Sequence, residues 1–125
     1  MPEQSRPNLK ILVVDDESLV CEAVEMILSF DGYEVVTAAS GQEALALLEK
    51  NRFDLVTTDY TMPGMNGAEL AAAIKARVPE QPVIMITAHA EILKTSGVPA
   101  GVDYLINKPF QLKELREAIQ TVSSR

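Results

Sequence analysis

Five short apolar runs recur along the chain, and each is followed by a stretch in which apolar residues have helical spacing. The runs are rich in Val, Ile and Leu and contain little polar alternation, which is typical of strands buried on both faces in a parallel sheet. The expected strands span residues 10–14, 33–38, 53–58, 83–87 and 104–107.

Helices are expected in the intervening segments, because apolar residues there recur every three or four positions. The expected helices span residues 17–30, 40–50, 68–77, 90–96 and 111–123. Ser40 with Glu43, and Asn66 with Glu69, have the spacing of capping boxes at helix starts. Gly32 suits the left-handed residue that ends the first helix.

Alternating strands and helices predict an α/β fold with a doubly wound parallel sheet, since each helix supplies the crossover that parallel strands require. The 125 residues fit a single domain. Residues 1–8 are polar, contain two prolines and are expected to form a loose leader. The domain is expected to span 9–123, with no output domain in the sequence.

Composition and charge argue against several classes of function. The net charge of −7 disfavours direct binding to nucleic acid or to an anionic membrane. No apolar run approaches the roughly 20 residues of a membrane span, and no signal peptide is present at the N-terminus. The single cysteine, Cys21, excludes an internal disulfide and is interpreted as a small buried helix residue. We expect a cytoplasmic protein.

Charged side chains gather where the strands end. Asp15 and Asp16 follow the first strand, Asp59 follows the third, and Lys108 follows the fifth. Each has an ordinary structural explanation alone, as a helix cap, a turn residue or a surface lysine. The carboxyl ends of parallel strands meet at one edge of the sheet. Crowded carboxylates resist ionisation unless a cation joins them, so the combination predicts a cation-binding site.

These residues also carry a resemblance to a known family. The chain resembles the receiver domain of bacterial two-component response regulators over about residues 9–123. The matching positions are Asp15-Asp16, Asp59, Met62-Pro63 with Gly67, Thr87-Ala88 and Lys108-Pro109-Phe110. The resemblance implies a flavodoxin-like (βα)5 fold, similar to chemotaxis regulators, with strand order 2-1-3-4-5.

The resemblance implies a phosphorylation site that uses Mg²⁺. Asp59 matches the phosphoacceptor, and a carboxylate can form an acyl phosphate. Asp16 and Asp59 match the direct carboxylate ligands, and Asp15 matches a ligand that acts through water. The backbone carbonyl of Thr61 falls at a further ligand position. Such an all-oxygen set suits Mg²⁺.

The resemblance also implies a phosphate-binding and switch set. Thr87, Ala88 and Lys108 match the residues that contact the phosphoryl group, and the bond before Pro109 is expected to be cis. Many receivers carry an aromatic residue three positions before the lysine, where this chain has Leu105. The usual aromatic switch is therefore in doubt.

Tyr104 lies one residue before that position, so it faces the other side of the strand. It is interpreted as a structural tyrosine, with a surrogate switch role as the alternative. The short helix 90–96, which Gly97 and Pro99 cut off, is another candidate for the moving element.

The expected function is a signalling switch rather than an enzyme with a separate substrate. A histidine kinase or histidine phosphotransfer protein would supply the phosphoryl group, and the surface of 90–96, 104–107 and 111–123 would carry the output. The alternatives are a Mg²⁺-dependent phosphoaspartate-type hydrolase and a binding module that is not phosphorylated. The cognate kinase, the output partner or C-terminal domain, and a phosphorylation-dependent homodimer stay open.

Thr61 and His89 lie two residues after Asp59 and Thr87, at positions that influence phosphate hydrolysis in the family. His89 is otherwise an exposed loop residue. We predict that His89→Ala changes the dephosphorylation rate without preventing phosphorylation, because the residue lies at a position that influences hydrolysis in the family. Decay of the labelled phosphoprotein measures this rate, and an unchanged rate would show that His89 has no such role.

Overall fold

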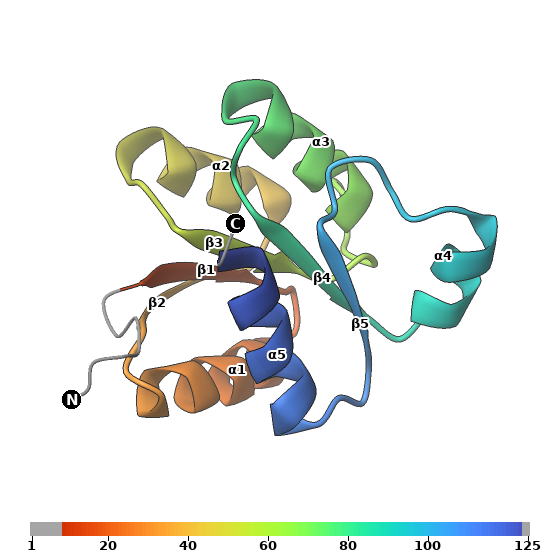
Figure 1. The fold of residues 1–125 in the computed structure, drawn as a ribbon. Coiled ribbons are helices and arrows are strands. Elements are labelled where there is room, and N and C mark those ends of the chain that lie inside the picture. Colours follow the sequence, from red (N-terminus) through yellow and green to blue (C-terminus); the bar gives the residue numbers. More distant parts are fainter. Residues whose placement is uncertain (1–8, 124–125) are drawn as a thin grey trace.

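The computed structural model describes residues 9–123 as a five-stranded parallel sheet with helices on both faces (Figure 1). Neighbouring strands follow the order β2-β1-β3-β4-β5, which confirms the predicted doubly wound topology. The strands are β1 (Lys10–Val14), β2 (Glu34–Ala38), β3 (Leu55–Thr58), β4 (Val83–Thr87) and β5 (Tyr104–Asn107).

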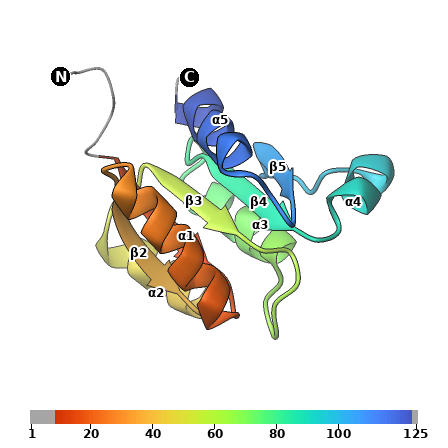
Figure 2. The same cartoon turned by 90° about the horizontal axis from the view of Figure 1, so that it is seen from below.

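Helices cover the sheet in two layers. Helices α1 and α5 lie on one face and α2 and α3 on the other, while α4 lies beyond the β5 edge (Figures 1 and 2). The helices are α1 (Ser18–Phe30), α2 (Gly41–Lys50), α3 (Gly67–Arg77), α4 (Ala90–Ser96) and α5 (Leu112–Ser123). No helix within 9–123 combines the length and the apolar character that a membrane span needs.

Two hydrophobic cores form, one on each face of the sheet. In β1, Ile11 and Val13 belong to the core beneath α1 and α5, whereas Leu12 and Val14 belong to the core beneath α2 and α3. This division follows from the alternation of side chains along a strand. All four are almost completely buried. The double burial explains why this strand contains no polar alternation.

Most expected boundaries agree with the structure, and the differences are confined to element ends. The segment 53–58 is shorter as a strand, because β3 begins at Leu55. Asp54 instead accepts a hydrogen bond from the backbone N–H of Lys10 through Oδ2, at 2.8 Å. Glu17 is the N-cap of α1 rather than its first helical residue. Gly32 has a positive φ of 96°, as its place after α1 predicts.

Side-chain caps begin two of the helices. Asn66 and Glu69 form the complete capping box that their spacing predicts at α3. The box predicted at α2 is only half correct. Ser40 Oγ accepts from the N–H of Glu43, but Glu43 Oε1 accepts from the N–H of Ala39, one residue before the cap. Either arrangement satisfies N–H groups that the helix itself leaves without partners.

Tyr104 and Leu105 occupy opposite sides of β5. Tyr104 packs against the core beneath α1 and α5, as a structural tyrosine would. Leu105 is half-buried and points to the other side, as the alternation along a strand requires.

The α3 capping box leads to a stability prediction. Asn66→Ala removes the side-chain acceptor for the Glu69 N–H, so it should lower the free energy of unfolding by about 1 kcal/mol. Urea denaturation followed by circular dichroism measures the change. Asn66→Asp keeps an acceptor oxygen and should stay within about 0.5 kcal/mol of the parent. Equal losses in both variants would contradict a capping role.

Candidate functional site

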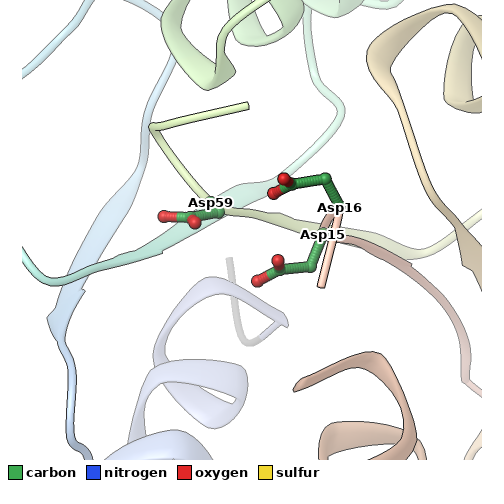
Figure 3. A group of neighbouring side chains, drawn as sticks. All are labelled: Asp15, Asp16 and Asp59. Atoms are coloured by element: carbon green, nitrogen blue, oxygen red, sulfur yellow. The ribbon is translucent and has the colours of Figure 1, made fainter. Parts of the chain in front are cut away.

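Three carboxylates lie together at the carboxyl-terminal edge of the sheet. Asp15 and Asp16 follow β1, and Asp59 follows β3 (Figure 3). Strands β1 and β3 pair in parallel, with Val14 opposite Thr58, so the residues after them must be neighbours. One carboxylate oxygen from each aspartate lies within 4.8 Å of the others. Asp15 and Asp59 are buried, whereas Asp16 is exposed.

Lys108 brings an ammonium group to two of these carboxylates. Its Nζ lies 3.2 Å from Asp15 Oδ2 and 3.4 Å from Asp59 Oδ2. Its backbone N–H donates to the carbonyl of Thr87 over 2.9 Å, which continues the pairing of β4 and β5 beyond their ends. The bond between Lys108 and Pro109 is cis, the isomer that the resemblance implies.

Burial and neighbouring charges shape the ionisation of the cluster. Burial raises the pKa of Asp59, and the carboxylate of Asp15 raises it further. The ammonium of Lys108 and the N–H of Tyr60 act in the opposite direction. Burial alone would lower the pKa of Lys108, but the carboxylates of Asp59 and Asp15 outweigh it and raise this pKa.

The donor set fits a hard divalent cation. Three carboxylates and one ammonium leave two negative charges at the cluster, and oxygen is the ligand atom that Mg²⁺ prefers. One ligand residue is exposed to solvent, so a cation there could keep some of its waters. A carboxylate beside such a cation can act as a nucleophile toward phosphorus. The arrangement therefore suits phosphoryl transfer.

The other predicted site residues lie on the loops around this edge. Thr87 is completely buried at the end of β4, and its Oγ1 accepts from the N–H of His89 over 3.2 Å. Ala88 and His89 are exposed between β4 and α4. Thr61 is exposed on the loop after β3. The effects of Thr61 and His89 on phosphate lifetime stay predictions.

Backbone groups hold the acid cluster in ways that residue types do not reveal. The N–H of Tyr60 donates to Asp59 Oδ1 over 2.7 Å, and the N–H of Glu17 donates to Asp15 Oδ1 over 2.9 Å. The Sγ of Cys21 donates to the carbonyl of Asp15 over 3.3 Å. Burial raises the pKa of the Cys21 thiol. Every residue type except proline offers a backbone N–H, so residue types alone do not identify the two N–H contacts.

The crowding of the cluster leads to a prediction about thermal stability. Asp59→Asn removes one of three repelling carboxylates, so we expect it to raise the melting temperature in metal-free buffer at pH 7. Because Mg²⁺ relieves the same repulsion, it should stabilise the parent more than the variant. Differential scanning calorimetry with and without Mg²⁺ measures both effects.

Asp54→Asn is the matched control, since Asp54 immediately precedes β3, at the end opposite to Asp59. It should keep the parent's response to Mg²⁺. A lower melting temperature for Asp59→Asn without metal would show that repulsion does not dominate at this site.

Comparisons with known proteins agree with this geometry. Residues 11–120 match the profile described as the response regulator receiver domain. Response regulator MprA of Mycobacterium sp. (strain KMS) is 36% identical over 118 residues, which cover 94% of this chain and 51% of MprA. A probable transcriptional regulator, ycf27 of Porphyra purpurea, is 38% identical over 117 residues, covering 93% and 48%. The chain thus spans about half the length of these relatives.

Solved structures show the same fold. A putative response regulator from Chloroflexus aurantiacus J-10-fl superposes with a TM-score of 0.88 at 35% identity, over 94% of this chain and 99% of that one. Response regulator TrrA from Thermotoga maritima, solved in complex with Mg²⁺-BeF, gives a TM-score of 0.85 at 33% identity, over 91% and 98%. Sequence match, fold and acid cluster agree, and the chain belongs to the response regulator receiver domain family.

Proposed function

We propose that this receiver domain is switched by phosphorylation of Asp59. The observation that carries the proposal is the position of the Asp59 carboxylate, which is buried beside Asp15 and Asp16 and contacts the ammonium of Lys108. Of these three aspartates, Asp16 is the one exposed to solvent.

The phosphoryl donor is a histidine kinase or a histidine phosphotransfer protein. An oxygen of Asp59 attacks phosphorus, so that an O–P bond forms while the N–P bond of phosphohistidine breaks. The bonding electrons stay with the imidazole, which takes up a proton from water. Phosphoryl transfer depends mainly on positioning and on neutralising charge, and both are available here.

Mg²⁺ is the cofactor that the donor set fits. Asp16 and Asp59 would bind it directly, Asp15 would act through water, and the backbone carbonyl of Thr61 would complete the protein ligands. When bound, the ion neutralises charge on the phosphoryl oxygens. The solved complex of TrrA with Mg²⁺-BeF supports this choice.

Phosphorylation changes the charge of the site. It removes one carboxylate charge and adds a phosphoryl group of about −2, so the site becomes about one unit more negative. The Lys108 ammonium and the Thr87 hydroxyl can then donate to phosphoryl oxygens, with Ala88 beside them. Contacts made only with the phosphorylated form bias the equilibrium between two conformations.

The output surface is the face formed by α4, β5 and α5. Helix α4 has only seven residues and ends at Gly97, features of an element with low local stability. Leu105 on β5 replaces the aromatic residue common in the family, so movement of α4 is the favoured readout. A phosphorylation-dependent homodimer could use the same face.

The remaining assignments follow from the family and the charge of the chain. The domain spans 9–123 and acts in the cytoplasm, with no catalytic activity beyond its own phosphorylation and dephosphorylation. The net charge of −7 argues against direct contact with nucleic acid. The output partner stays open, because the chain matches only 51% of MprA.

Incubation with acetyl phosphate and Mg²⁺, followed by intact-mass spectrometry, tests the proposal. The parent should gain one phosphoryl group that decays on removal of the donor, and Asp59→Asn should gain none, because it lacks the nucleophilic oxygen. Chelation of Mg²⁺ should also prevent the gain.

Asp54→Asn serves as the control and should be phosphorylated like the parent. Release of many equivalents of phosphate without a trapped adduct would indicate a hydrolase, and neither adduct nor turnover would indicate a binding module. Phosphorylation of Asp59→Asn at the parent's rate would overturn the assignment of the acceptor.

A further inference from the structure

The peptide group between Asp59 and Tyr60 connects the acid cluster to the start of α3. In a trans peptide the carbonyl oxygen and the N–H point in opposite directions. The N–H of this group points at Asp59 Oδ1, with 2.7 Å between nitrogen and oxygen. Its carbonyl oxygen therefore points away from the carboxylate. Anything that holds this oxygen also sets the direction of the N–H.

Two groups hold the carbonyl oxygen of Asp59. The hydroxyl of Thr58 donates to it over 2.9 Å, in a buried environment. Gly67, the first residue of α3, lies directly against it: a Cβ at Gly67 would be 2.0 Å from the oxygen and 2.9 Å from the Cα of Tyr60. The Gly67 N–H also donates to the carbonyl of Tyr60 over 2.8 Å. Only glycine allows this approach.

We infer that Thr58 and Gly67 are positioning residues for the Asp59 carboxylate. By fixing the peptide plane, they aim the Tyr60 N–H at Oδ1, while Oδ2 stays directed at Lys108 Nζ, 3.4 Å away. The two carboxylate oxygens therefore have different partners, and these partners hold the side chain in one orientation. This inference rests on the proposed function, because orientation affects the reaction only if Asp59 accepts the phosphoryl group.

The neighbouring threonine provides a matched control. Thr57 and Thr58 are adjacent in β3, and each is 1% exposed. Among residues 9–123, Thr58 is the residue whose side chain donates a hydrogen bond to the Asp59 carbonyl. Thr58→Val removes that donor at nearly constant volume, Thr57→Val makes the same change without touching it, and Thr58→Ser keeps a hydroxyl.

The first measurement is the amide proton shift of Tyr60 in ¹H–¹⁵N NMR spectra, recorded without metal or phosphodonor. Thr58→Val should move this signal upfield because the hydrogen bond to the carboxylate weakens, whereas Thr57→Val and Thr58→Ser should leave it near the parent position. Loss of stability alone would not select this one amide.

The second measurement is the rate of phosphorylation by acetyl phosphate with Mg²⁺. Thr58→Val should react roughly three to ten times more slowly, the effect expected for losing one hydrogen bond that holds the reacting group. Thr58→Ser should restore most of the rate. Gly67→Ala should slow phosphorylation at least as much as Thr58→Val does. Circular dichroism shows whether the Gly67→Ala variant folds.

An unmoved Tyr60 amide in Thr58→Val, or an equal shift in Thr57→Val, would overturn the inference. Both results are available even if Gly67→Ala fails to fold. A parent protein that never gains a phosphoryl group would instead refute the proposed function, since the NMR comparison needs no phosphodonor.

Discussion

Repulsion among buried carboxylates is the constraint around which this fold is arranged. Asp15 and Asp59 are both buried, and burial raises the pKa of Asp59. The ammonium of Lys108 lies between them and contacts both within 3.4 Å. One cation cannot balance three carboxylates, so the site keeps a negative charge that a divalent metal ion is suited to neutralise. The same excess charge underlies both the predicted gain in stability of Asp59→Asn and the fit of the site to a divalent cation.

The strand order makes this meeting of charges possible. Asp15 and Lys108 are 93 residues apart in the sequence. The sheet contains the order β1-β3-β4-β5. The side chain of Lys108, which follows β5, must therefore extend past the end of β4 to contact Asp59 and Asp15. The backbone N–H of Lys108 donates to the carbonyl of Thr87, which fixes the position from which the lysine side chain extends. Lys108 therefore links the acid cluster to the ends of β4 and β5.

A second support for Asp59 comes from α3, which lies on the other face of the sheet from α1 and α5 (Figure 1). Helix α3 begins with a capping box, and its first residue packs against the backbone of Asp59. The backbone of Asp59 is thus held by the start of α3, while its side chain contacts Lys108. In the proposed function, this support would keep the orientation of the carboxylate during the reaction.

Much of this protein was readable from residue types and their order. Continuous apolar runs identified the five strands, and helical spacing identified the five helices, because burial on both faces of a sheet excludes polar residues from its strands. Asp15, Asp16, Asp59 and Lys108 could be predicted to meet, since the carboxyl ends of parallel strands share one edge. Strand limits were less certain. Asp54 ended as a partner for the N–H of Lys10, which is 44 residues away, so local pattern could not show where β3 begins.

The folded chain alone established how the site is held. The distances from Lys108 to its carboxylates, the N–H of Tyr60 on Oδ1 and the contact of Gly67 with the Asp59 carbonyl depend on how separate elements pack. Backbone groups are the same in every residue except proline, so their use as partners leaves no trace in composition or spacing. The residues of the acid cluster and Lys108 were visible in the sequence because their side chains are chemically distinctive. The groups that support them were hidden because they are backbone atoms and the close approach of a glycine.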